Sequence, residues 1–196
     1  MWNEAEKYLS KDKRLKVLIK KYGPCIIKPL KKSEYFSDLV DAICSQQLSG
    51  KAAKTIFGRV RAGVGGKITP EAILKTKDEK LRSFGLSWAK VSYVKDLAKH
   101  VLAKELILNR LSTLSDEEVV AQLIAVKGIG RWTAEMFLMF SLARADIFPI
   151  DDLGIKKGSE KLTGKRLMGP ALARFGETFK PHRTVASWYI WRSLEN

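Results

Sequence analysis

The stretch Val126-Lys127-Gly128-Ile129-Gly130-Arg131-Trp132-Thr133-Ala134 decides the fold of this chain. Glycine allows the backbone to turn tightly and brings its N–H groups close to a ligand, because no Cβ stands in the way. These N–H groups stand at the N-terminus of the following helix, where unsatisfied donors and the helix dipole favour an anion. The stretch therefore predicts a hairpin that grips a phosphate, with Ile129 plugged into the core and Lys127 adding charge.

Helical patterns lie on both sides of the hairpin. Ser115 and Glu118 have the spacing of a capping box, and apolar residues follow at helical intervals up to the hairpin. A second apolar helix follows it, so we assign a helix-hairpin-helix to about residues 116–143. An ordinary corner between two helices is the alternative. Phosphate contacts position a protein without reading bases, so the motif alone does not imply an enzyme.

The rest of the chain also indicates helices, because no long stretch alternates apolar and polar residues as a strand does. Thr76 with Glu79 predicts a further capping box. Other helix starts are predicted at Ser33, Ser49, Thr69, Ser87 and His182. The predicted fold class is all-α.

Composition limits the possible partners and cofactors. The 196 residues carry 36 Lys and Arg against 21 Asp and Glu, a net charge of +15 that attracts polyanions such as nucleic acids. The apolar runs are too short to cross a bilayer, and the N-terminus lacks the apolar block of a signal peptide, so we expect a cytoplasmic, nucleoid-associated protein. Cys25 and Cys44 are too few for a four-thiolate zinc or iron–sulfur site, and we expect both to be inert.

Two adjacent carboxylates follow the hairpin helix, in Phe148-Pro149-Ile150-Asp151-Asp152-Leu153-Gly154-Ile155-Lys156. Acidic groups are rarely placed in an apolar segment without a partner, so this pair needs a reason. Capping of a helix N-terminus could account for either one. The alternative interpretation is that one of the two carboxylates is catalytic.

The hairpin together with this acidic segment resembles the helix-hairpin-helix-Gly/Pro-Asp superfamily of base-excision DNA glycosylases. Within it, the chain is most similar to the 3-methyladenine DNA glycosylase II family. Matching stretches occur at residues 42–49, 81–87 and 179–191. The resemblance implies an all-α, two-lobed fold with the active-site cleft between the lobes. It places residues 34–145 in a central lobe, and residues 1–33 with 146–196 in a second lobe.

The resemblance also implies a monofunctional glycosylase that flips alkylated purines out of duplex DNA and hydrolyses the glycosidic bond. It assigns the catalytic carboxylate to Asp152 rather than Asp151, although a shift of one residue would exchange them. Trp132 and Trp191 correspond to aromatic pocket walls, and Gln46 lies near the pocket. Bifunctional relatives have a Schiff-base lysine where Trp132 stands, so no lyase activity is expected.

The remaining implied contacts concern DNA and cations. Either Gln47 or Leu48 is expected to wedge into the minor groove and fill the gap left by the flipped base. Further DNA contacts are expected from Lys127, Gly128, Gly130 and Thr133. The family's hairpin carbonyls can hold Na⁺ or K⁺, here at Ile124, Val126 and Ile129.

No other cofactor and no iron–sulfur cluster is expected, and the partner is double-stranded DNA with alkylated bases, bound by a monomer. Three other functions stay open at this point. They are a non-catalytic helix-hairpin-helix DNA-binding protein, a glycosylase for another damaged base, and a basic RNA-binding protein.

Overall fold

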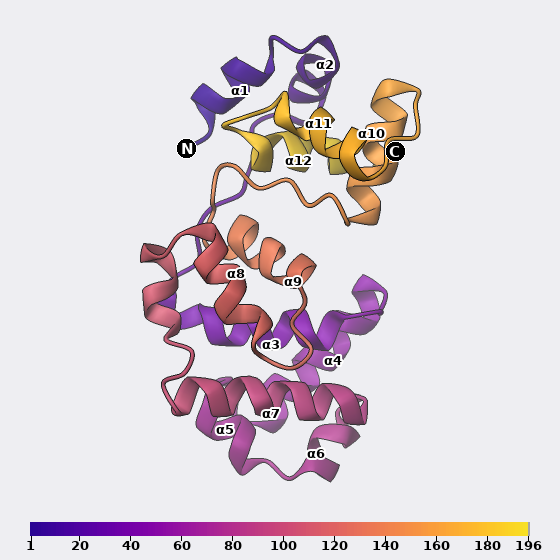
Figure 1. Cartoon of the computed structure of the whole chain (residues 1–196). Helices are drawn as coiled ribbons and strands as arrows, with labels where there is room; N and C mark the ends of the chain where they lie inside the picture. The colour runs from indigo at the N-terminus through magenta and orange to yellow at the C-terminus, as the bar shows by residue number, and fades with distance from the viewer. Residues whose placement is uncertain (196) are drawn as a thin grey trace. The chain divides into compact units, whose positions relative to one another are not determined.

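The computed structural model describes residues 1–195, which form helices joined by short connections (Figure 1). No strand occurs in this part of the chain, so the predicted all-α class is confirmed. The chain divides into two compact units: Met1–Pro29 together with the chain from Leu138 onward, and Leu30–Phe137. The sequence placed these borders at residues 34 and 145.

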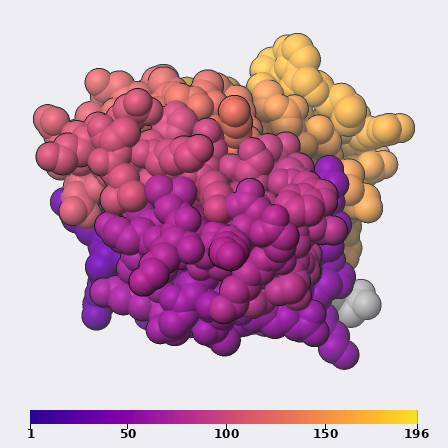
Figure 2. All heavy atoms as spheres, turned by 90° about the horizontal axis from the view of Figure 1, so that it is seen from below, coloured from indigo at the N-terminus to yellow at the C-terminus, as the bar shows by residue number. Residues whose placement is uncertain are grey.

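The unit Leu30–Phe137 is built around α7 (Trp88–Leu102), whose buried side packs against α3, α5 and α6. Ser49, Thr69 and Ser87 accept backbone N–H groups at the starts of their helices, as predicted. Figure 2 shows the molecule from below, with the purple and magenta residues of this unit facing the viewer. Its other helices are α3 (Tyr35–Ser45), α4 (Gly50–Gly63), α5 (Pro70–Lys75), α6 (Asp78–Ser83), α8 (Asp116–Ile124) and α9 (Arg131–Met136), with 3-10 turns at Lys32–Glu34 and Leu108–Thr113.

Two predicted helix starts are wrong. The Thr76 hydroxyl donates to the Ala72 carbonyl at 2.8 Å and closes α5, so it does not cap the next helix. This back-bonding competes with capping in threonine, and α6 instead follows Lys77 without a side-chain cap. Ser33 lies inside the 3-10 turn, and α3 begins at Tyr35.

In the other unit, α12 (Arg183–Arg192) is the central helix, and α1, α2 and α10 pack against it. The Tyr189 hydroxyl lies 2.9 Å from the Gly23 carbonyl oxygen and 3.0 Å from Oε1 of Glu6. Burial and the Glu6 carboxylate raise the pKa of Tyr189, so the phenol stays protonated and holds the N-terminal segment on α12. The helices around α12 are α1 (Asn3–Leu9), α2 (Lys13–Tyr22), α10 (Leu153–Thr163) and α11 (Gly169–Glu177). A π-helical segment at Phe137–Ser141 comes before α10 in the chain.

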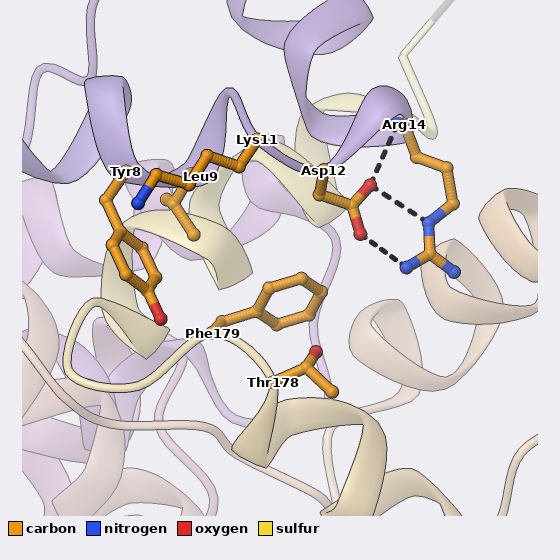
Figure 3. Close-up of a pocket in the computed structure, with 7 residues that line it drawn as sticks. All are labelled: Tyr8, Leu9, Lys11, Asp12, Arg14, Thr178 and Phe179. Carbon is orange, nitrogen blue, oxygen red and sulfur yellow. Dashed lines mark hydrogen bonds and ion pairs between the residues drawn. The ribbon is translucent and has the colours of Figure 1, made fainter.

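The connection between α1 and α2 is fixed by one carboxylate. Asp12 accepts the backbone N–H of Arg14 and is bound by its guanidinium through both oxygens, as Figure 3 shows. The Arg14 side chain, as the strongest contributor, lowers the pKa of Asp12. A cavity of about 370 Å³ lies beside this pair and is also lined by Tyr8, Lys11 and Phe179.

Both cysteines are buried, Cys25 in the unit of α12 and Cys44 in α3. Burial raises the pKa of Cys25 to about 11 and that of Cys44 to about 12. Because the thiolate is the reactive and metal-binding form, neither thiol is activated near neutral pH. Within residues 1–195, no helix is long and apolar enough to cross a membrane, and no cluster of three or more His, Cys, Asp or Glu is arranged to bind a metal ion.

Two helical glycines should respond oppositely to alanine. A Cβ at Gly158 would lie 2.5 Å from the Ile190 carbonyl oxygen, whereas Gly58 has open space around it. We expect Gly158→Ala to lower the free energy of unfolding by about 1–3 kcal/mol, as overpacking does. Gly58→Ala should raise it by up to about 1 kcal/mol, because glycine weakens a helix interior. Urea unfolding measures both, and destabilisation by Gly58→Ala or none by Gly158→Ala would contradict the packing described.

Candidate functional site

The predicted hairpin connects α8 and α9. The Ile129 N–H donates to the Val126 carbonyl at 3.1 Å and closes the turn, and Gly128 has a φ of 80° that favours glycine. Ile129 is only 4% exposed, so it fills the core as predicted. Gly130 precedes the first turn of α9 and provides no side-chain cap to it.

Helix α7 packs against the hairpin through two side chains that were not predicted from the sequence. A Cβ on Gly128 would lie 2.2 Å from Cδ2 of Tyr93, so the ring packs directly on the glycine backbone. The Asp96 carboxylate accepts the Lys127 backbone N–H at 2.9 Å. No local signal could reveal these contacts, because Asp96 and Lys127 are separated by 31 residues.

A cavity of about 520 Å³ opens beside the hairpin, a volume within the usual range of ligand pockets. Trp132 contributes a ring that is 44% exposed. Seven residues predicted for the pocket or for DNA contact line this cavity: Gln46, Gln47, Leu48, Gly128, Gly130, Trp132 and Thr133. The fold thus brings together two segments that are about eighty residues apart in the sequence.

The turn of residues 46–48 projects from the end of α3. The Gln46 side chain does not point freely into the cavity, since its amide Nε2 donates to the Gly128 carbonyl at 2.7 Å. Gln47 has a φ of 58°, which is uncommon for a residue other than glycine and is typical of functional turns. Leu48 is 39% exposed, so the turn presents an amide and an apolar side chain to solvent.

Asp152 caps α10 and also binds an indole. Its Oδ1 accepts the Ile155 backbone N–H at 2.8 Å and the Trp191 Nε1–H at 2.7 Å. Asp151 is exposed, and Nζ of Lys156 lies 3.9 Å from its Oδ1. The capping interpretation therefore holds for Asp152, but capping does not require the bond to Trp191.

Gly154 makes this bond possible. A Cβ there would lie 2.8 Å from Nε1 of Trp191 and 3.0 Å from Oδ1 of Asp152, so any side chain would separate the two. Phe140 stacks on the Trp191 ring, with centroids 5.8 Å apart and planes at 30°. Neither Gly154 nor Phe140 was predicted for the site. The helix after the hairpin was expected to continue to about residue 143, but the π-helical segment changes the register there and leaves Phe140 40% exposed.

The predicted residues thus form two sets, one in each unit. Asp152 and Trp191 contact each other in one unit, and the cavity residues with Trp132 lie in the other. The cleft expected between the lobes stays a prediction.

The three residues predicted to hold a monovalent cation belong to the hairpin. Val126 and Ile129 are buried, whereas Ile124 ends α8 with its side chain exposed. The Val126 carbonyl already accepts one hydrogen bond, and a carbonyl oxygen has a second lone pair for a cation. The monovalent cation at this place stays a prediction.

The profile described as "HhH-GPD superfamily base excision DNA repair protein" matches residues 40–166. The chain belongs to this superfamily. The resemblance predicted from the hairpin and the acidic segment is therefore confirmed.

Relatives in this superfamily match nearly the whole chain. DNA-3-methyladenine glycosylase 1 of Schizosaccharomyces pombe is 37% identical over 92% of this chain and 81% of its own length. Alkylbase DNA glycosidase-like protein mag2 of the same yeast is 31% identical over 97% and 93%.

Two solved structures also share the fold. That of the S. pombe 3-methyladenine DNA glycosylase in complex with abasic DNA has a TM-score of 0.87 and 36% identity, covering 97% of this chain and 96% of that one. That of a DNA-3-methyladenine glycosidase from Bacillus halodurans has a TM-score of 0.85 and 36% identity, covering 99% and 90%.

The contact between Asp152 and Trp191 can be observed directly in solution. We expect Gly154→Ala to push the indole away from the carboxylate and to move the Trp191 Nε1–H proton resonance upfield. Nitrogen–proton correlation spectra resolve the five tryptophan side chains, and Trp191→Phe identifies the relevant peak. Gly58→Ala is the control and should leave that peak in place. An unmoved peak in Gly154→Ala would show that the hydrogen bond is not made.

Proposed function

We propose that this protein is a monofunctional DNA glycosylase that removes alkylated purines, of the 3-methyladenine and 7-methylguanine type, from duplex DNA. It acts as a monomer and leaves an abasic site. The observation that carries the proposal is a carboxylate, Asp152, held by an indole and a helix N-terminus in a chain whose relatives are named DNA-3-methyladenine glycosylases. The hairpin and its cavity supply the means of holding DNA.

The chemistry starts with a base that must leave the stack, because its glycosidic bond is hidden inside a duplex. Alkylation at N3 or N7 gives the purine a positive charge and makes it a good leaving group. The C1′–N bond breaks with its electron pair going to the purine, and positive charge develops on the sugar. A fixed carboxylate stabilises that charge and directs a water molecule to C1′. The water oxygen forms a bond to C1′, and its proton passes through the carboxylate to solvent.

Asp152 is suited to this role because its orientation is set before any substrate arrives. Two donors hold Oδ1, the Ile155 N–H and the Trp191 indole. A charge that needs no reorganisation during the reaction stabilises a transition state more effectively than a mobile one. Trp191 thereby serves two purposes, since its ring also offers a face that attracts a cationic base, with about 0.5–2 kcal/mol for such a contact.

DNA would be held mainly through its phosphates. The backbone N–H groups around Gly128 and Gly130 bind a phosphate without reading sequence, which suits an enzyme that searches for rare lesions. Gln47 or Leu48 fills the gap left by the flipped base. A monovalent cation held by the carbonyls of the hairpin would add positive charge beside the phosphate.

Replacing the carboxylate tests the catalytic role. Asparagine caps a helix nearly as well as aspartate, so Asp152→Asn should keep the fold while removing the negative charge. We expect release of methylated purines to slow by roughly 100- to 1,000-fold. Incubation with methylated DNA and mass spectrometry of the released bases measures this, with a binding assay on abasic duplex alongside.

The matched control is Asp151→Asn, which removes the same charge one residue away and should release bases at the normal rate. If Asp152→Asn also released bases normally, the carboxylate would have no catalytic part. If the unaltered protein released none, a non-catalytic DNA-binding protein of the same fold would be the better description.

The absence of lyase activity is tested on the same DNA. A strand nick by this route needs an amine that forms a Schiff base with the sugar, and position 132 of this chain carries an indole. We expect breaks only after alkali treatment, and no covalent protein–DNA adduct on reduction with borohydride. Breakage without alkali, or a trapped adduct, would make the enzyme bifunctional.

A further inference from the structure

The C-terminus of α3 has an unusual cap. The last carbonyls of a helix have no partner within it, and cations near that end are favoured by the dipole. The last turn of α3 contains no basic residue. Its cation comes instead from α7, because Nζ of Lys90 donates to the carbonyls of Cys44 and Gln46, at 2.7 Å each.

These two bonds do more than end a helix. Cys44 belongs to α3, but Gln46 is already in the turn of residues 46–48, so the ammonium group joins the helix to the turn. Gln47 follows directly with its positive φ, a conformation that persists only where its surroundings impose it. Lys90 is half-buried, and loss of hydration lowers its pKa, so its placement costs free energy that hydrogen bonds must offset.

The same side of α7 also holds the hairpin. Lys90, Tyr93 and Asp96 succeed one another at intervals of three residues, and they contact the turn, Gly128 and Lys127 respectively. The Gln46 amide also joins the turn directly to the hairpin, through its hydrogen bond to the Gly128 carbonyl. The turn and the hairpin are therefore both fastened to one helix and to each other.

We propose that Lys90 is a positioning residue that sets the turn of residues 46–48 relative to the hairpin, so that both engage DNA together. It does not touch the substrate itself. When a phosphate is bound at the hairpin, the fixed spacing places the turn against the neighbouring base pair. Without the ammonium group, the hairpin still binds phosphate but the turn no longer enters the duplex in register. The inference rests on the proposed function in taking duplex DNA as the ligand.

The test uses the full chain and three variants. Lys90→Met removes the donors and keeps the length, Lys90→Arg keeps charge and donors, and Lys99→Met removes the same charge from an exposed position of α7. The first readout is fluorescence of 2-aminopurine placed next to a tetrahydrofuran abasic analogue, which rises when the turn unstacks it. The second is affinity for that duplex, and the third is the single-turnover rate of 7-methylguanine release at saturating protein.

We expect Lys90→Met to lose most of the fluorescence rise and to release the base about 10- to 100-fold more slowly, because a misplaced turn no longer holds the substrate in a reactive position. Its affinity for the duplex should match that of Lys99→Met, because both lose one charge. Lys90→Arg should recover fluorescence and rate, since a guanidinium can donate to both carbonyls. Thermal unfolding of each variant shows that the fold persists. If Lys90→Met does not fold, Lys90→Gln, which retains one amide donor group, takes its place.

Equal behaviour of Lys90→Met and Lys99→Met would overturn the proposal, and so would a well-folded Lys90→Arg that recovers nothing. Loss of affinity with an unchanged rate at saturation would also overturn it, because Lys90 would then act only in binding. The fluorescence readout needs no chemistry. If the unaltered protein raised the fluorescence but released no base, the proposed enzymatic function would fail while the positioning role of Lys90 stood.

Discussion

A chain built only from helices has its unsatisfied backbone N–H and C=O groups at helix ends, and these groups must find partners elsewhere. In this protein the three candidate functional features all lie at such ends. The hairpin N–H groups precede α9, the carboxylate of Asp152 caps α10, and the turn of residues 46–48 leaves the end of α3. The requirement to satisfy helix ends therefore also determines where ligands and charges can be placed.

Two of these three ends are held by a side chain from another helix. Trp191 on α12 holds the Asp152 carboxylate, and Lys90 on α7 holds the carbonyls at the end of α3. Such partners make the end rigid, whereas a cap from the same helix would leave the site free to move with that helix. Rigid placement matters for a site whose effect depends on a charge or a wedge being in position before the substrate arrives.

Close approach of aromatic rings to backbone is the second common feature. Gly128 accommodates Tyr93, and Gly154 accommodates Trp191, each within a distance that no Cβ would permit. Glycine is required at the two positions for different reasons. Gly128 also needs a positive φ, whereas Gly154 is required only because there is no space for a Cβ. A glycine two residues after a capping acid can therefore leave room for an aromatic ring beside the carboxylate.

The sequence by itself determined the helical class, most helix starts, the hairpin and its buried isoleucine, and the superfamily. The helical class, the helix starts and the hairpin follow from local rules, because capping chemistry, apolar periodicity and the conformational freedom of glycine act within a few residues. The superfamily rests instead on the resemblance of the hairpin and the acidic segment to a known family. Only the tertiary structure decided that Lys90, Tyr93 and Asp96 hold the hairpin and the turn, that Gly154 seats Trp191 against Asp152, and that Phe140 stacks on that indole. These contacts join residues about 30 to 46 positions apart, or depend on a π-helical change of register, and neither leaves a periodic trace along the chain.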